Sequence, residues 1–122
     1  MTPKAKLKLI CGAIEDKQGQ DVRILDISKV SSFTDYFVLC TANNPRQSQS
    51  IADEIEARLK KESVRPSHIE GRRSNDWVLL DYGDIVVHIF SPAYRSFYAL
   101  ERLWSDGKTI DPGILQSRKS RG

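Results

Sequence analysis

Three stretches of the chain carry apolar residues at the spacing of a helix that buries one face. The first helix is expected over about residues 3–17, where one face holds Leu7, Ile10, Cys11 and Ile14. The second begins after Asn44, a residue that favours the N-cap, and buries Ile51, Ala52, Ile55 and Leu59. The third starts at about Ser91, with proline at the next position, as helix starts often have.

Runs rich in β-branched and aromatic residues lie between these helices and predict strands. They cover about residues 22–27, 36–42, 67–70, 77–82 and 85–90. The second run is apolar without alternation, as in a central strand that is covered on both faces. The order helix, two strands, helix, three strands, helix predicts an α/β (α+β) fold: one mixed sheet of about five strands packed with three helices.

Gly83 and Asp84 form a two-residue turn signal between the last two strands, which sets their register. Residues opposite one another share a face of the sheet. One face of this hairpin is then almost wholly aliphatic, with Val78, Leu80, Tyr82, Ile85, Val87 and Ile89, and is expected to pack on the helices. The other face is mixed: Trp77, Leu79, Asp81, Val86, His88 and Phe90.

The mixed face has two interpretations. Because an unpaired buried Asp81 or His88 would cost several kcal/mol, these groups either satisfy each other or remain partly wet. A partly wet face that carries Trp77 and Phe90 is typical of a protein-binding surface with aromatic anchors. Alternatively, a helix covers the face and His88 is a satisfied core histidine. The pattern alone does not decide between the two.

Composition and charge narrow the function further. The chain has 122 residues, 39% of them hydrophobic and 29% charged, and a net charge of +3. We expect one folded domain over residues 1–105 and a basic, flexible tail over residues 106–122. The domain itself is nearly neutral, which is a poor electrostatic footprint for nucleic acid. No apolar run approaches ~18 residues, so no membrane association is predicted and the protein is expected in the cytoplasm.

Other functions need residues that the sequence provides only weakly. A nucleotidyltransferase-like, metal-dependent enzyme would use Asp26, Asp81 or Asp84, but no glycine-rich phosphate loop or nucleophile motif accompanies them. A general RNA-binding module would use Arg72, Arg73 and the tail. No Cys/His spacing suggests zinc, and both cysteines are expected to be buried thiols.

Several separated motifs, in order along about residues 7–104, resemble the ribosomal silencing factor family, also called Iojap-related. They are residues 35–41 (DYFVLCT), 46–47 (RQ), 50–53 (SIAD), 70–71 (EG), 76–77 (DW), 81–90 (DYGDIVVHIF) and 95–104 (RSFYALERLW). The resemblance implies a nucleotidyltransferase-like topology without the catalytic carboxylates, and therefore no enzyme activity, catalytic residue, metal or cofactor. It further implies a cytoplasmic protein that often forms homodimers when free.

The resemblance also implies a partner and a mechanism. Family members bind the large ribosomal subunit through its ribosomal protein numbered fourteen, block subunit joining, and repress translation when nutrients are short. By position, Trp77 matches the family's contact tryptophan, and Asp81 and His88 match motif residues of the neighbouring strands. Arg95 and Tyr98 match the third helix, where a structural or rim role is expected. Leu79 and Phe90 complete the expected partner-binding face, with the tail as a peripheral contact to ribosomal RNA.

Overall fold

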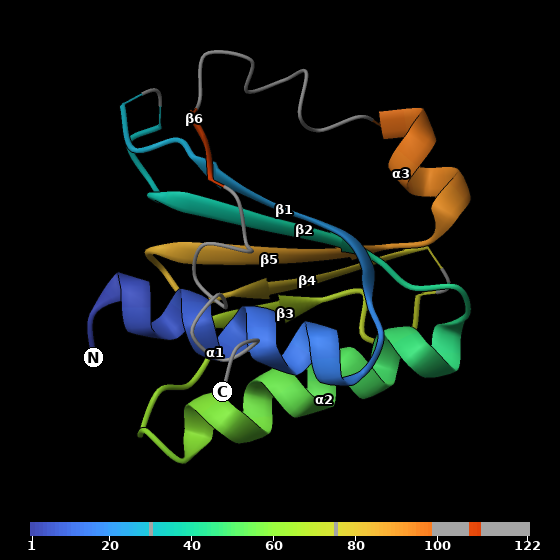
Figure 1. Ribbon diagram of the computed structural model, residues 1–122, viewed down its shortest axis with the longest axis horizontal. Coiled ribbons are helices and arrows are strands. Elements are labelled where there is room, and N and C mark those ends of the chain that lie inside the picture. The colour runs from blue at the N-terminus through green and yellow to red at the C-terminus, as the bar shows by residue number, and fades with distance from the viewer. Residues whose placement is uncertain (30, 75, 99–107, 111–122) are drawn as a thin grey trace, which may run out of the picture.

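The computed structural model describes residues 1–29, 31–74, 76–98 and 108–110, with side chains through residue 95 (Figure 1). The elements are α1 (Pro3–Asp16), β1 (Gln20–Asp26), β2 (Tyr36–Thr41), α2 (Pro45–Lys60), β3 (His68–Glu70), β4 (Trp77–Asp81), β5 (Ile85–Phe90), α3 (Pro92–Tyr98) and β6 (Lys108–Ile110). The sheet has the strand order β3-β4-β5-β2-β1-β6. Only the β2–β5 pairing is parallel, so the sheet is mixed, as predicted.

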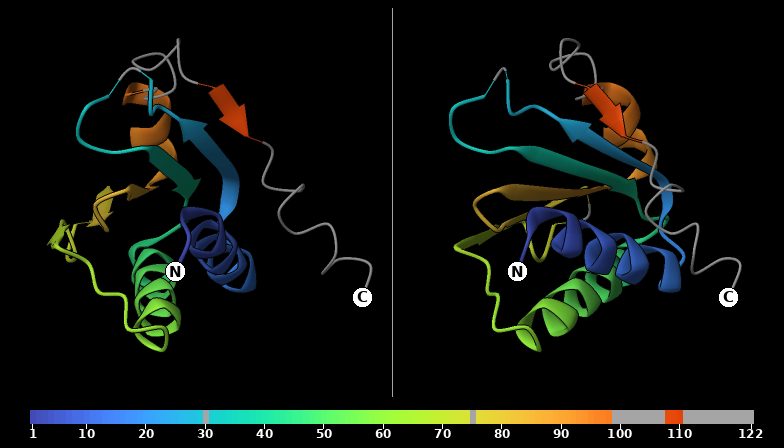
Figure 2. Two further views of the ribbon diagram at one scale, coloured as in Figure 1. Left: turned by 90° about the vertical axis from the view of Figure 1, so that its left-hand side faces the viewer. Right: turned by 60° about the vertical axis from the view of Figure 1, so that its left-hand side comes forward.

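The two long helices cover one face of the sheet (Figure 2). Their apolar stripes form one core cluster with alternate residues of β4 and β5, including Leu80, Val87 and Ile89, which are fully buried. Tyr94 of α3 packs against the apolar residues of the opposite face. The prediction that the aliphatic face of the hairpin packs on the helices is therefore confirmed.

Side chains cap the N-termini of the first two helices, and the cap at Asn44 is the predicted one. The Thr2 hydroxyl accepts a hydrogen bond from the backbone N–H of Ala5 at 3.1 Å. The Asn44 side chain accepts one from the N–H of Gln47 at 2.8 Å, and Gln47 in turn accepts from the N–H of Asn43 at 2.7 Å. These bonds satisfy donors that a helix N-terminus leaves without intrahelical partners.

The hairpin register is also the predicted one. Trp77 lies opposite Phe90, Leu79 opposite His88, and Asp81 opposite Val86. Central strand β2 is buried along almost its whole length, as its unbroken apolar run indicated. Cys11 and Cys40 are buried free thiols, and burial raises the pKa of each to about 12.

The C-terminal region differs from the sequence prediction. Residues 108–110 form a sixth strand, β6, which pairs with β1 and lies within the segment assigned to the tail. A three-residue strand has no detectable periodicity, and its pairing with β1 depends on a long-range contact that the local pattern does not encode. The part of the third helix predicted beyond Tyr98 lies outside the described residues. No described helix is long and apolar enough to cross a membrane.

Candidate functional site: a hollow beside Trp77

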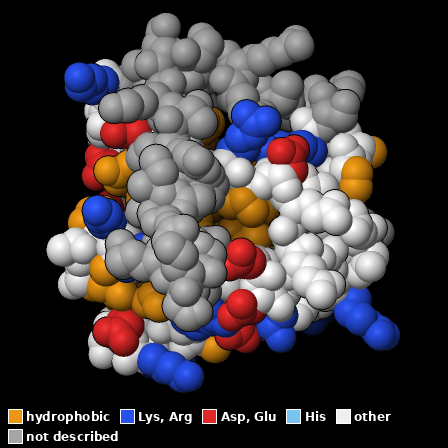
Figure 3. Space-filling view, in the orientation of Figure 1, with side chains coloured by type: hydrophobic (Ala, Val, Ile, Leu, Met, Phe, Trp, Pro, Cys, Tyr) orange, Lys and Arg blue, Asp and Glu red, His pale blue; other side chains and the backbone are white. Residues whose placement is uncertain are grey.

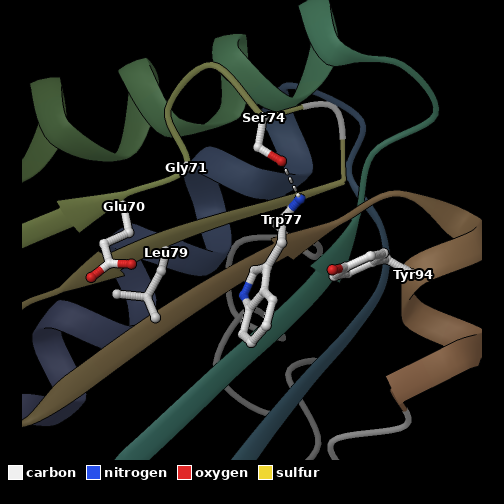
Figure 4. A pocket seen from close by; sticks show the side chains of 6 residues that line it. All are labelled: Glu70, Gly71, Ser74, Trp77, Leu79 and Tyr94. Carbon is white, nitrogen blue, oxygen red and sulfur yellow. Dashed lines mark hydrogen bonds between the residues drawn. The ribbon is translucent and has the colours of Figure 1, made fainter.

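A hollow of about 260 Å³ lies on the mixed face, near the edge of the sheet (Figure 4). We call it the Trp77 hollow. It is lined by Glu70, Gly71, Ser74, Trp77, Leu79 and Tyr94. The close view shows the indole of Trp77 between Leu79 on one side and Tyr94 on the other. Trp77 is half-buried, so part of its ring system is available to a partner.

The strand register explains why these residues meet. Glu70 of β3 lies opposite Leu79 of β4, and Leu79 lies opposite His88 of β5. Trp77 comes two residues before Leu79 and therefore points to the same side of the sheet. The hollow is thus a direct product of strand pairing, with the exposed Glu70 at its outer rim and buried residues toward the sheet centre.

The loop before β4 fixes the backbone of Trp77. Gly71 has a φ of +72°, and a Cβ there would lie 2.1 Å from the carbonyl oxygen of Trp77, so only glycine fits. The N–H of Ser74 donates to the carbonyl of Gly71 at 2.7 Å. The Ser74 hydroxyl accepts from the N–H groups of Asp76 at 3.0 Å and Trp77 at 3.2 Å. This compact loop sets the position from which the indole projects.

The start of α3 is tied to the same loop through Ser91. The Ser91 hydroxyl donates to a carboxylate oxygen of Asp76 at 3.0 Å, and its N–H donates to the carbonyl of Asp76 at 2.8 Å. The same hydroxyl accepts from the N–H of Tyr94 at 3.2 Å, as an N-cap does. These bonds hold Tyr94 beside Trp77, and the ring centroids lie 6.0 Å apart.

Beneath the hollow, His88 anchors the indole. The Trp77 Nε1–H donates to Nδ1 of His88 at 3.1 Å, so a neutral imidazole carries its proton on Nε2. The imidazole stacks on Phe90 at 5.9 Å between centroids, and Phe37 meets it edge-on at 4.6 Å. Burial lowers the pKa of His88 to about 4, which keeps the ring neutral and able to accept at ordinary pH.

The mixed face combines elements of both sequence interpretations. His88 is 4% exposed and Phe90 is 1% exposed, so both lie below the surface of the chain. Trp77, Leu79 and Asp81, by contrast, are partly exposed. Mutual pairing of Asp81 and His88, one of the two alternatives, is not among the bonds found: the Asp81 carboxylate accepts from the N–H of Gly83 at 2.8 Å, and Trp77 bonds His88.

The two residues predicted on the third helix have different outcomes. The Arg95 side chain is buried and donates to the Thr41 hydroxyl at 3.1 Å, and it lies 3.6 Å from a carboxylate oxygen of Asp21. Arg95 therefore joins α3 to the ends of β1 and β2, which is a structural role. The side chain of Tyr98, at the end of α3, lies outside the described residues.

The residues proposed for catalysis have separate local partners. Asp26 accepts from the backbone and hydroxyl of Ser28, at 3.0 and 2.7 Å. Asp84 pairs with Lys6 at 3.2 Å. Among the residues with described placement, no three His, Cys, Asp or Glu side chains gather as a metal site requires. This arrangement offers no convergent acidic centre of the kind that metal-dependent phosphoryl transfer uses.

The charge distribution gives RNA binding little support. Arg72 is held by Glu56 at 2.5 and 2.8 Å and by Asp53 at 3.1 Å, so its charge is balanced within the fold. On the described surface of the view in Figure 3, basic and acidic side chains are interspersed. A phosphate backbone is bound best by a continuous basic patch.

Sequence reasoning missed four residues of the hollow: Glu70, Gly71, Ser74 and Tyr94. Pairing the short strand β3 with β4 would have placed Glu70 opposite Leu79, but no local signal in the sequence assigns a partner to this strand. Gly71 directly after a short strand is a turn signal, although nothing in the sequence shows that it approaches Trp77. Ser74 and Tyr94 are placed at the hollow by hydrogen bonds of the loop and of the α3 N-terminus, and no periodic sequence pattern indicates such bonds.

These observations define a small α+β protein with a partly exposed tryptophan in a hollow near the edge of its sheet. The comparisons with known proteins give the family. The family described as "Ribosomal silencing factor during starvation" matches residues 1–122. The chain therefore belongs to the ribosomal silencing factor family.

Individual relatives agree with this assignment. The Bacillus subtilis protein named ribosomal silencing factor RsfS is 39% identical over 91% of this chain and 94% of its own length. Its Zymomonas mobilis counterpart is 38% identical over 94% and 86%. A crystal structure of a Chromobacterium violaceum protein superposes with a TM-score of 0.83 at 36% identity, covering 91% of this chain and 92% of the other. A more distant mouse relative, 25% identical, is named mitochondrial assembly of ribosomal large subunit protein 1.

Proposed function

We propose that this protein binds the large ribosomal subunit through the ribosomal protein numbered fourteen and sterically blocks joining of the small subunit. Translation is thereby repressed when nutrients are limiting. Family membership supports a role in ribosomal silencing, and the name of the mouse relative points to the large subunit. The observation that carries the proposal is the partly exposed Trp77, held in the hollow by its backbone bond to Ser74, its indole bond to His88, and ring contacts with Phe90 and Tyr94.

The physical basis is that of an interface anchor. Aromatic residues in preorganised pockets dominate the energy of protein interfaces, because they bury a large area and lose little conformational entropy. Trp77 is already fixed through its backbone by Ser74 and through its indole by His88. In this proposal Leu79 and Asp81 adjoin the contact, while buried His88 and Phe90 support Trp77 from below, and Arg95 keeps α3 in place.

The proposal includes the remaining expectations for this chain. The protein acts by occupying a surface rather than by catalysis, which agrees with the separate pairing of Asp26, Asp81 and Asp84. It works in the cytoplasm, where ribosomal subunits join. It forms a homodimer when free, and residues 106–122 make at most a peripheral contact with ribosomal RNA.

The test is a subunit-joining assay with separated ribosomal subunits on sucrose gradients. We expect the wild-type protein to lower the yield of joined ribosomes, and Trp77→Ala to weaken binding to large subunits about 30-fold or more, because truncating an anchor aromatic costs ~2–4 kcal/mol. The matched control is Phe33→Ala. Phe33 is 67% exposed and precedes β2, whose first residue pairs with Ile85, at the opposite end of β5 from Phe90 and Trp77.

Thermal unfolding of each variant shows whether the fold is kept. A folded Trp77→Ala protein that still blocks joining as well as the wild type would refute the role of the hollow. Normal joining of subunits at saturating wild-type protein would refute the proposed function itself.

A further inference from the structure

The walls of the Trp77 hollow combine an aromatic ring with a carboxylate, which restricts what can enter. We propose that the hollow receives a lysine or arginine side chain of the ribosomal partner, with its cationic head between Trp77 and Glu70. This inference rests on the proposed function and specifies the chemistry of the contact. Two observations support the inference: the register of β3, β4 and β5, and the contacts of the Glu70 carboxylate.

The register arranges this side of the sheet from apolar to acidic toward the edge. His88 and Phe90 on β5 are buried, Leu79 and Trp77 on β4 are half-buried, and Glu70 on β3 is exposed. The neighbouring row differs, since there the edge residue is His68, which lies opposite Asp81 of β4. A partner that approaches over the edge beside Leu79 therefore meets the Glu70 carboxylate first and the aromatic wall next.

The negative charge of Glu70 is not balanced by a permanent cation in the contacts found. Its side chain is 68% exposed, and one carboxylate oxygen lies 2.6 Å from Nε2 of His68. An imidazole, unlike the ammonium of lysine or the guanidinium of arginine, is not a permanent cation. Arg72, the closest arginine along the chain, is engaged by Glu56 and Asp53 on α2. The rim of the hollow thus presents an available anion.

The dimensions and chemistry fit one long basic side chain. The hollow, at about 260 Å³, is of side-chain size, and the exposed Glu70 is one of the residues that line it (Figure 4). The alkyl stem of lysine or arginine packs on apolar surface such as Leu79, while its charged head is attracted to the face of an indole and to a carboxylate. A purely apolar side chain would instead desolvate Glu70 without compensation.

The experiment compares three charge variants for binding to isolated large ribosomal subunits at low and high salt. Glu70→Gln keeps the size of the side chain and removes its charge. Glu62→Gln makes the same change at an exposed position just after α2. Arg73→Gln removes a positive charge from the exposed loop next to the hollow and has the opposite sign.

We expect Glu70→Gln to weaken binding about 3- to 10-fold at low salt, with a smaller difference at high salt because the screening length shortens. Glu62→Gln should bind like the wild type, and Arg73→Gln should bind equally or slightly more tightly. A double-mutant cycle against neutralised Lys and Arg residues of the ribosomal partner should then show coupling to Glu70 at one of them.

The outcomes separate this inference from the proposed function. If Trp77→Ala abolishes binding but Glu70→Gln binds like the wild type at every salt concentration, the occupant is apolar and the inference is wrong, while the proposed function stands. Weakened binding of Arg73→Gln, with Glu70→Gln unaffected, would indicate contact with RNA phosphate and would also overturn it. If the wild type itself does not bind large subunits, the proposed function fails first.

Discussion

The two faces of the sheet are made from alternate residues of the same strands, but they are completed in different ways. On the helix-covered face, α1 and α2 bury Leu80, Val87 and Ile89 completely. On the mixed face, the neighbouring residues Leu79 and Trp77 remain partly exposed around a hollow. A step of one residue along β4 therefore moves a side chain from the closed core to the open site.

The difference shows how a binding surface can be rigid without being covered. The helix-covered face depends mainly on the close packing of aliphatic groups, whose burial drives folding. The mixed face depends on directional contacts: Ser74 and His88 bond Trp77, and Ser91 bonds Asp76. These short-range bonds fix the aromatic side chains in place and leave the outer part of Trp77 available.

The largest expected effect separates the two faces at adjacent positions. Leu80→Ala should lower the free energy of unfolding by about 3–4 kcal/mol, because it leaves a cavity beneath the helices. Leu79→Ala, one residue away, should lower it by only about 1 kcal/mol, because its side chain is already partly exposed. Urea denaturation of both variants measures the difference.

Binding should show the reverse order. Folded Leu80→Ala protein should bind large ribosomal subunits like the wild type, whereas Leu79→Ala should weaken binding, because Leu79 lines the hollow. Equal stability losses at the two positions would remove the distinction between the faces. The measurement is best made at a temperature where Leu80→Ala is still fully folded by circular dichroism.

Much of this contrast follows from the sequence because it is local. Gly83 and Asp84 specify a tight hairpin, and the two-residue periodicity of strands then assigns Leu79 and Leu80 to opposite faces. The helix starts at Thr2 and Asn44 are equally local, since each depends on one side chain and one backbone donor. Such features need no knowledge of distant contacts.

The remaining features depend on contacts between distant residues. The pairing of β6 with β1 joins residues about 85 positions apart. The bond from the Trp77 indole to His88 depends on the rotamers of both side chains, and the sequence left open whether Asp81 or water would satisfy His88. Glu56 of α2 binds Arg72 of the β3–β4 loop, a contact across 16 positions that no local pattern indicates. Side-chain partners of this kind are decided by tertiary packing.

The next effect tests how the mixed face responds to acid. Burial lowers the pKa of His88 to about 4 in the folded protein. Between about pH 6.5 and 4, therefore, the histidine is protonated in the unfolded chain but stays neutral in the folded protein. Proton uptake lowers the free energy of the unfolded state relative to the folded state, and His88 should contribute a loss of stability of about 3 kcal/mol as the pH falls through this window. Stability from this group is complete above pH 6.5.

His88→Asn is the matched variant for this measurement. An asparagine oxygen takes the place of Nδ1 as acceptor for the Trp77 indole but does not titrate. The carboxylates titrate in both proteins, so the difference between the two pH profiles of unfolding isolates the histidine. The variant should lose less stability than the wild type between pH 6.5 and 4; parallel profiles would mean that His88 is protonated in the folded protein.

The smallest of these effects compares two glycines in the loops before and after β4, Gly71 directly after β3 and Gly83 in the β4–β5 turn. Both have positive φ, +72° at Gly71 and +88° at Gly83, so alanine is strained at either position. Only at Gly71 would the new Cβ also meet the backbone of Trp77, at 2.1 Å, whereas nothing lies within 4 Å at Gly83. We expect a stability loss of about 2 kcal/mol for Gly71→Ala and about 1 kcal/mol for Gly83→Ala.

The functional readout makes this pair more informative than stability alone. Gly71→Ala must push the loop away from Trp77, which moves the wall of the hollow, so binding to large ribosomal subunits should weaken beyond what the unfolded fraction explains. Gly83→Ala strains a turn at the far end of the hairpin and should leave binding unchanged. If both variants bind equally well, the position of the loop has no effect on binding, and the hydrogen bond to His88 is sufficient to orient the Trp77 indole.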